Sequence, residues 1–152
     1  ERFIPLREEM KTVRDYLLIQ EERFGDKISV VYDVEQESCG YQVPNFILQP
    51  LIENAIIHGL EPKIGKGNLS ITIKREKEKL LVCVQDDGVG MTPEEIDVLY
   101  RQCEENDTKQ FIGLKNVYRR LLLCYGEESR LDIESTKNRG TKIQFYIPLQ
   151  NH

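Results

Sequence analysis

Residues that bind metals or cross-link chains are scarce in this sequence, which has four cysteines and two histidines among 152 residues. The cysteines form no CxxC pair and do not cluster with the histidines, so we expect no zinc site. Cys83 lies in an apolar strand and Cys124 on an apolar helix face, where a free thiol is usually a small core residue. This pattern is typical of proteins from a reducing cytoplasm.

The sequence also lacks an apolar run long enough to cross a membrane, and no signal peptide precedes Glu1. It has no excess of basic residues either, since 26 acidic and 21 basic side chains give a net charge of −5. We therefore expect neither nucleic acid nor an anionic membrane surface as the main partner, because both attract basic patches. The chain does not begin with methionine, which predicts a fragment; a membrane anchor would then lie outside it.

The composition, 39 % hydrophobic and 31 % charged, is ordinary for one soluble domain with a sizeable core. Its periodicity predicts an α/β (α+β) sandwich, in which helices cover one side of a mixed sheet. Residues 103–110 are polar and unpatterned, which suits a mobile lid. The expected helices cover residues 5–24, 44–59, 93–102 and 113–126, and the expected strands cover residues 27–34, 69–75, 80–85, 130–135 and 141–147.

The central stretch, residues 49–59, places a carboxylate, an amide and an imidazole beside a buried apolar face. Burying an unpaired polar group costs roughly 1 to 3 kcal/mol, so Glu53, Asn54 and His58 need polar partners. Those partners belong either to a core hydrogen-bond network or to a ligand site. The apolar face itself consists of residues that recur at helical spacing: Leu51, Ile52, Ala55 and Ile56.

Two prolines bear on where this helix begins. Pro44 suits the first turn, where its missing N–H is not needed. Pro50 removes a backbone hydrogen bond and clashes with the preceding turn, so it predicts a kink or a late start.

Two glycine motifs follow at domain-scale distances. DDGVG at residues 86–90 ends an apolar strand, and its glycines allow the main chain to turn sharply and approach a ring closely. Gly113 opens a helix, where free N–H groups and the positive end of the dipole can face a phosphate. Taken alone, Asp86 could be a turn residue at a strand end, and Gly113 a plain loop-to-helix glycine.

Taken together, ENAIIHG, DDGVG, IGLKN and the closing RGT resemble the N, G1 and G2 boxes and the final Gly-Thr of the Bergerat ATP-binding fold. The stretches LREEMKTVRDYLLIQEERFGDKI and VPNFILQPLIENAIIHG are similar to sensor histidine kinases of the LytS/YesM type. The resemblance covers nearly the whole chain. It implies a connecting helix from the phosphoacceptor region at residues 1–25 and an ATP-binding catalytic domain at residues 26–150. The implied reaction transfers the γ-phosphoryl of ATP to a histidine on a segment absent from this chain.

The resemblance also implies cofactors and partners. The expected cofactors are ATP and Mg²⁺, and the expected partners are the phosphoacceptor histidine segment of the full-length protein and a response regulator. The full-length protein is expected to be a homodimer anchored in the cell membrane, with this domain in the cytoplasm.

Site residues are carried over motif by motif. Asn54 matches the magnesium-binding asparagine, and Asp86 matches the carboxylate that accepts the adenine amino proton. Glu53 is implied near the triphosphate as the catalytic residue that polarises the incoming nucleophile. For His58 a hydrogen bond in the core is the alternative to a nucleotide contact. The full set of expected nucleotide contacts is Asn54, His58, Asp86, Gly88, Gly90, Met91, Gly113, Leu114, Lys115, Asn116 and Thr141.

Three positions depart from related families and define the rival functions. Pro50 stands where gyrase-type ATPases and anti-sigma-factor serine kinases place a catalytic glutamate, one turn before Asn54. A neutral imidazole nucleophile needs less help from a base than water or serine, so Pro50 favours a histidine kinase. The serine kinase remains the alternative because it also uses ENAIIHG. Phe111 and Ile57 replace a lid glycine and a phosphate-binding lysine, which would suit a non-catalytic, nucleotide-gated interaction module.

Overall fold

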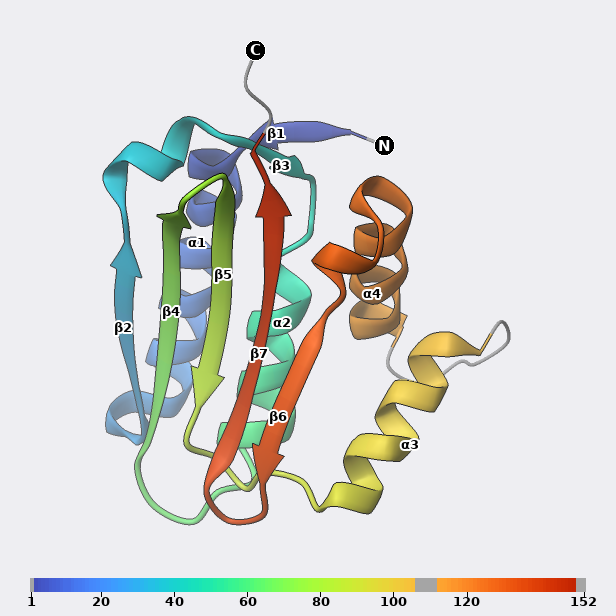
Figure 1. Cartoon of the computed structure of the whole chain (residues 1–152). Coiled ribbons are helices and arrows are strands. Elements are labelled where there is room, and N and C mark those ends of the chain that lie inside the picture. The colour runs from blue at the N-terminus through green and yellow to red at the C-terminus, as the bar shows by residue number, and fades with distance from the viewer. Residues whose placement is uncertain (1, 106–111, 150–152) are drawn as a thin grey trace.

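Five strands form the central sheet of the computed structural model, which describes residues 2–105 and 112–149 (Figure 1). Strand β2 runs parallel to β4, and the other neighbouring pairs are antiparallel, so the predicted mixed sheet is confirmed. The spatial order is β2-β4-β5-β7-β6. The bounds are β2 Ile28–Val34, β4 Gly67–Glu76, β5 Lys79–Asp86, β6 Asp132–Thr136 and β7 Gly140–Pro148.

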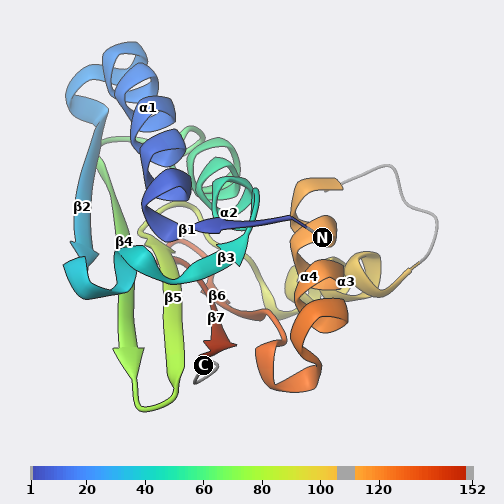
Figure 2. The ribbon, with the colours of Figure 1, turned by 90° about the horizontal axis from the view of Figure 1, so that it is seen from above.

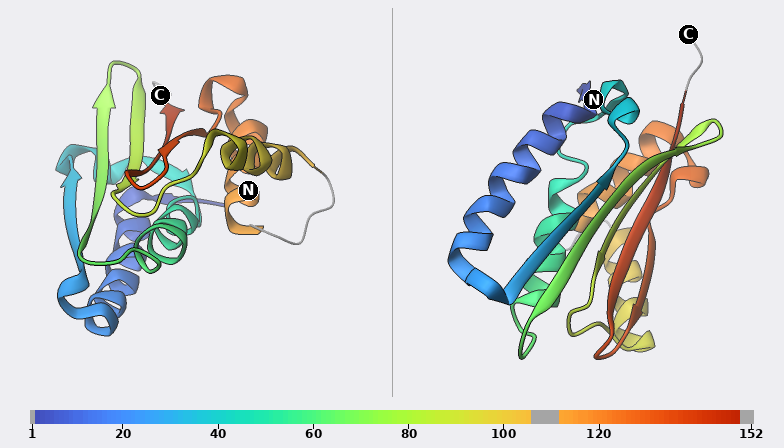
Figure 3. Two further views of the ribbon diagram at one scale, coloured as in Figure 1. Left: turned by 90° about the horizontal axis from the view of Figure 1, so that it is seen from below. Right: turned by 90° about the vertical axis from the view of Figure 1, so that its left-hand side faces the viewer.

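The α-helices are α1 (Leu6–Phe24), α2 (Gln49–Asn54), α3 (Pro93–Glu104) and α4 (Ile112–Tyr125). A π-helical turn, Ala55–Leu60, continues α2, and short 3₁₀ turns lie at Gly25–Lys27, Gln36–Gly40 and Glu127–Ser129. Figure 2 and the right-hand view of Figure 3 show α1 and α2 against one face of the sheet. Helices α3 and α4 lie towards the β6 edge (Figure 1). The predicted α/β sandwich is therefore confirmed.

One hydrophobic core fills the space between the sheet and these helices. Alternate residues of each strand face the helices, as the period of two in a strand requires. Helix α1 contributes to the same core. The expected division into a connecting helix, residues 1–25, and a catalytic domain, residues 26–150, stays a prediction. Full burial of such side chains stabilises the fold by about 1.5 to 3 kcal/mol each. Core residues from α1 and β4 include Leu6, Met10, Val13, Leu17, Leu69, Ile71 and Ile73.

The region before α2 differs from the prediction. Pro44 does not open the central helix; it ends β3 (Gln42–Pro44), which pairs with β1 (Phe3–Pro5) in a two-stranded antiparallel ribbon. That pairing partner lies about forty residues earlier, so the local pattern around Pro44 did not reveal it. Helix α2 begins at Gln49 with Pro50 in its first turn, which confirms the late start expected for Pro50.

Charged side chains from α1 and α4 hold the turn that leads into α2. Glu9 is buried and accepts the backbone N–H groups of Phe46, at 2.7 Å, and Leu48, at 3.1 Å. Arg120 of α4 donates to the carbonyls of Asn45 and Phe46. Phe46 has a φ of 60°, which is uncommon for a residue other than glycine. These contacts stabilise that conformation.

Glu9→Ala is expected to lower the free energy of unfolding by about 2 to 4 kcal/mol, because two backbone N–H groups, one of them buried, lose their acceptor. Glu8 is exposed on the same helix, so Glu8→Ala is the matched control and should change stability by less than about 0.5 kcal/mol. Denaturant unfolding of both variants measures the difference. A small loss in Glu9→Ala, equal to that of the control, would show that the carboxylate is not needed to hold the turn.

Helix α3 begins at residue 93, as predicted, and a capping box holds its first turn. The Thr92 hydroxyl accepts the N–H of Glu95 at 3.2 Å, and the Glu95 carboxylate accepts the N–H of Thr92 at 3.0 Å. The helix reaches Glu104, so Cys103 is not the start of a lid but a buried helical residue. Burial of its apolar face against α4 and the sheet extends the helix beyond its predicted end. The rest of the predicted lid, residues 106–110, and Phe111 lie outside the described residues.

Helix α4 places Leu114, Val117 and Leu121 in the core. Cys124 is only half-buried, because it lies at the last turn of the helix, beside a groove rather than under the sheet. Cys83 is buried on β5, as expected. No helix in the described ranges combines the length and apolar character needed to cross a bilayer.

Candidate functional site

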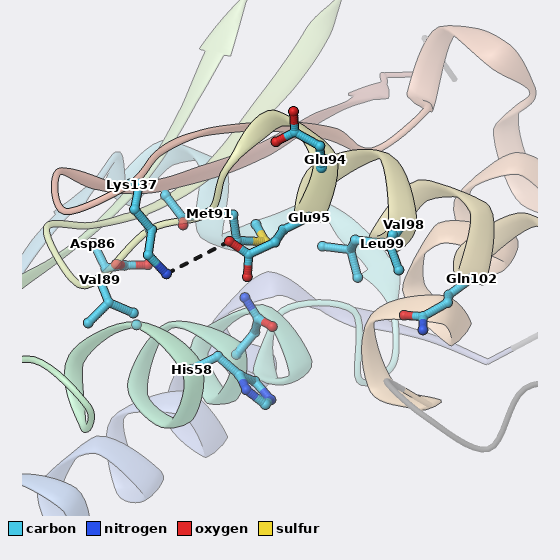
Figure 4. Close-up of a pocket in the computed structure, with 14 residues that line it drawn as sticks. His58, Asp86, Val89, Met91, Glu94, Glu95, Val98, Leu99, Gln102 and Lys137 are labelled. Carbon is cyan, nitrogen blue, oxygen red and sulfur yellow. Dashed lines mark ion pairs between the residues drawn. The ribbon is translucent and has the colours of Figure 1, made fainter.

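A cavity of about 520 Å³ lies between α2, α3 and the carboxyl end of β5 (Figure 4). Small-molecule sites usually measure roughly 300 to 1,000 Å³, so this space suits a ligand of that size. We call it the larger cavity. It is lined by Asn54, His58, Gly59, Asp86, Val89, Gly90, Met91, Glu94, Glu95, Val98, Leu99, Gln102, Lys137 and Thr141.

Asp86 supplies a buried carboxylate to this cavity. It is the last residue of β5, it is 5 % exposed, and it lies opposite Thr141 of β7. The pKa of Asp86 is raised to about 6, mainly by burial and in part by the Asp87 charge, while backbone hydrogen bonds from Gly88 and Thr141 oppose the shift. A carboxylate with a pKa perturbed in this way, on the wall of a cavity, is a candidate for binding a hydrogen-bond donor of a ligand.

Glycines allow the backbone to approach this carboxylate. A Cβ on Gly59 would lie 2.5 Å from Asp86 Oδ1, so a side chain there would displace the carboxylate. A Cβ on Gly88 would lie 2.1 Å from the carbonyl oxygen of Gly59, which accepts the Val89 N–H at 3.0 Å. Gly90 has a φ of 65°, which agrees with the predicted sharp turn. The DDGVG motif thus packs the end of β5 directly against the π-helical turn.

Ser135 of β6 connects separate parts of the cavity wall. Its hydroxyl accepts the Met91 N–H at 2.8 Å and donates to the Gly140 carbonyl at 2.9 Å. The Thr141 hydroxyl lies 2.8 Å from the Ser135 hydroxyl oxygen. These bonds hold the wall in place before any ligand binds.

A second, smaller cavity of about 120 Å³ lies between α2 and the first turn of α4. A Cβ on Gly113 would lie 3.3 Å from the Pro50 side chain, so glycine allows α4 to begin close to α2. Glu53 Oε1 accepts a hydrogen bond from Gln49 Nε2 at 3.0 Å, so its carboxylate already has a polar partner. The residues that line the smaller cavity are Pro50, Glu53, Asn54, Ile57, His58, Gly113 and Leu114.

Most predicted site residues meet at these two cavities. Asn54 and His58 line both, so the end of α2 and the π-helical turn that continues it connect the two cavities. His58 is exposed, which argues against the alternative role in the core. Three predicted residues line neither described cavity: Gly88 supports the wall, Lys115 is buried and Asn116 is exposed. The larger cavity includes Asp86, Gly90, Met91 and Thr141, and the smaller includes Glu53, Gly113 and Leu114. The binding roles of all these residues stay predictions.

The sequence reasoning missed one wall of the larger cavity. The sequence predicts a helix at residues 93–102, but no local signal indicated that this helix would face β5 and α2. Lys137 falls between the expected strands at residues 130–135 and 141–147, and its side chain lies at the cavity (Figure 4). The missed wall residues are Val89, Glu94, Glu95, Val98, Leu99, Gln102 and Lys137.

The role that the resemblance implies for Asp86, acceptance of the adenine amino proton, predicts a pH-dependent affinity. We expect the affinity for adenosine to weaken as the pH falls through about 6, because protonation removes the charged acceptor. Adenosine is chosen because it has no phosphate that titrates in the same range. Titrations at several pH values between about 5 and 8 give the profile. The Asp86→Asn variant should bind adenosine weakly, with an affinity that does not change with pH. If both proteins showed the same pH dependence, a group other than Asp86 would cause it.

The mixed sheet, with helices on one face and a cavity at the end of its central strands, has the architecture of the Bergerat α/β sandwich class. Residues 44–151 match the family described as histidine kinase-, DNA gyrase B- and HSP90-like ATPase. This chain belongs to that family.

Curated relatives extend the match to almost the whole chain. It is 38 % identical over 149 residues to sensor histidine kinase YpdA of Escherichia coli, covering 97 % of this chain and 25 % of the relative. It is 33 % identical over 153 residues to sensor protein LytS of Oceanobacillus iheyensis, covering 99 % of this chain and 26 % of the relative. The chain therefore spans about a quarter of the length of these two proteins.

Solved structures support the fold. The histidine kinase domain of a blue-light activated histidine kinase from Erythrobacter litoralis aligns with a TM-score of 0.69 at 22 % identity, covering 96 % of this chain and 62 % of that one. The catalytic domain of histidine kinase ThkA aligns with a TM-score of 0.68 at 18 % identity, covering 97 % and 96 %. At these identities the likeness concerns the fold alone.

Proposed function

We propose that this chain is the ATP-binding catalytic part of a sensor histidine kinase. It would transfer the γ-phosphoryl of ATP to a histidine outside residues 1–152. The observation that carries this proposal is the arrangement of the two cavities. A buried carboxylate, Asp86, lines the larger one, and Asn54 and His58 connect it to the smaller one at the start of α4.

The larger cavity suits the nucleoside end of ATP. The Asp86 carboxylate can accept the adenine amino proton, and a charge-assisted hydrogen bond is about twice as strong as a neutral one. Val89, Met91 and Leu99 supply apolar surface along the same cavity, which favours an aromatic base over a sugar or a peptide.

The smaller cavity suits the phosphates. Gly113 and Leu114 place the first turn of α4 there, and the positive end of a helix dipole stabilises an anion. Asn54 fits Mg²⁺, because its amide oxygen is a hard ligand and Mg²⁺ completes its shell with water and phosphate oxygens. When bound, this ion neutralises charge on the phosphates.

Glu53 and Pro50 bear on which group accepts the phosphoryl: a histidine, a serine or water. Phosphoryl transfer depends mainly on positioning and on charge stabilisation, and a neutral imidazole is a nucleophile without deprotonation. Pro50 lines the smaller cavity and carries no group that accepts a proton, which disfavours activation of water or a serine hydroxyl. Glu53 lines the same cavity, held by Gln49, and could orient the incoming imidazole.

The proposed partners follow from the same activity. The acceptor histidine would belong to another segment of the full-length protein, and a response regulator would receive the phosphoryl group from it. A homodimeric full-length protein with a membrane anchor is part of the proposal, with this domain on the cytoplasmic side. The anti-sigma-type serine kinase is the alternative, and Pro50 opposes it.

The test is incubation of this chain with γ-labelled ATP and Mg²⁺, first alone and then with a separate segment that carries the acceptor histidine. Acid-labile label should appear only on the added segment. His58 cannot serve as the acceptor, since it lines the proposed phosphate cavity itself. A segment with the histidine replaced by glutamine is the control. Rapid phosphate release by the chain alone would favour a gyrase-type ATPase, and acid-stable label on a serine would favour the serine kinase.

A further inference from the structure

An ion pair connects two walls of the larger cavity that are far apart in the sequence. Lys137, in the turn between β6 and β7, places its ammonium 3.7 Å from Glu95 Oε1 in the first turn of α3 (Figure 4). Both side chains line the cavity, and they are 49 % and 52 % exposed. The pair therefore lies at the mouth of the cavity rather than in the core.

The two side chains of this ion pair differ in how firmly their conformations are held. The Glu95 carboxylate also accepts the N–H of Thr92 at 3.0 Å, as part of the capping box, so it is held at the start of α3. Lys137 has a flexible four-carbon stem, and its ion pair is the contact that orients its ammonium at the cavity. An ion pair between half-exposed side chains stabilises a fold little, so its exchange for another acceptor has a small cost.

The charges around the cavity indicate a role for Lys137 as a hydrogen-bond donor to a ligand. Three acidic residues, Asp86, Glu94 and Glu95, line the larger cavity. Among the described residues that line it, Lys137 is the one with a permanently basic side chain. A nucleoside presents hydrogen-bond acceptors on its base nitrogens and ribose oxygens. Asp86 and Glu94 cannot donate to those acceptors when ionised, whereas an ammonium has three donors.

We propose that Lys137 is a nucleotide-contact residue and that Glu95 is its positioning residue. On binding, the Lys137 ammonium leaves Glu95 and donates to the base or ribose of the nucleotide. This inference rests on the proposed function, because it requires the nucleoside end in the larger cavity. Lys137 itself precedes the RGT motif, so it lies outside the motifs that carry the family resemblance.

Titration with ADP and with adenosine tests the proposal. Lys137→Met should weaken binding of both by about three- to tenfold, since one charged hydrogen bond is lost. Glu95→Gln preserves the capping box, because glutamine also serves at that position, and it frees Lys137. It should strengthen binding of both about twofold. In the double variant the gain from Glu95→Gln should disappear, because Glu95 acts through Lys137.

Lys142→Met is the matched control. Lys142 belongs to β7, pairs with Glu134 at 3.3 Å and does not line either described cavity, so its loss should leave both affinities unchanged. Equal effects of Lys137→Met and Lys142→Met would overturn the proposal. Weakening by Glu95→Gln would also overturn it, since the pair would then only hold the walls together. A loss confined to ADP would move the contact to the phosphates and overturn the nucleoside assignment. If the unmodified chain binds neither ligand, the proposed function itself fails.

Discussion

Asp86→Asn should lower the affinity for ATP about ten- to hundredfold while the domain stays folded. The amide can still offer an oxygen to the adenine amino group, but it loses the charge that strengthens the bond. Calorimetric titration with a non-hydrolysed ATP analogue measures the loss. An unchanged affinity would show that Asp86 does not contact the base.

The same substitution should stabilise the protein at a pH well above 6. Burial raises the pKa of Asp86 in the folded state to about 6 from its ordinary value of 3.8, so the fold disfavours the ionised form. Stability from this group is present at low pH and is lost as the pH rises through the interval between these two values. Near pH 8 the cost of the buried charge is about 2 to 3 kcal/mol, and the neutral amide avoids it.

Asp87→Asn is the matched control, because it makes the same chemical change one residue later. Partial burial alone would raise the pKa of Asp87, but hydrogen bonds from Asn68 and the Lys63 ammonium together lower it. Asp87 therefore stabilises the fold as an ion, and it does not line either described cavity. Asp87→Asn should lower the melting temperature and leave ATP affinity nearly unchanged, the reverse of Asp86→Asn. Matching behaviour of the two variants would contradict distinct roles.

Asn54→Ala should remove the magnesium-dependent part of nucleotide binding and reduce phosphoryl transfer on the order of 100-fold. In the proposed function the Asn54 amide oxygen holds Mg²⁺, and Asn54 lines both cavities. Without it, charge on the phosphates would be less well neutralised during transfer. Metal-free binding through Asp86 should remain.

The measurement compares ADP affinity with and without Mg²⁺ in the unmodified chain and the variant. Asn54→Asp serves as the control, since it keeps an oxygen ligand of similar reach and should retain most of the magnesium effect. If Asn54→Ala weakens metal-free binding as much as binding with Mg²⁺, then Asn54 supports the cavity wall and does not hold the metal.

The sequence determined the elements and the identity of the site motifs. The helical spacing of Leu51, Ile52 and Ile56 predicted a buried face, and all three are fully buried. The capping box at Thr92 predicted where α3 begins, and the apolar run before Asp86 predicted where β5 ends. These features are encoded within a few residues, through side-chain periodicity and local backbone hydrogen bonds, so a sequence reveals them.

Only the tertiary structure decided how these elements surround a cavity. Pro44 belongs to a ribbon because β1 lies beside it, and α3 faces α2 across the larger cavity because α3 packs against β6 and α4 (Figure 1). The raised pKa of Asp86 and the Lys137–Glu95 pair likewise depend on residues brought together from distant parts of the chain. The physical reason is that burial, desolvation and ion pairing depend on distances in space, which local propensity does not specify.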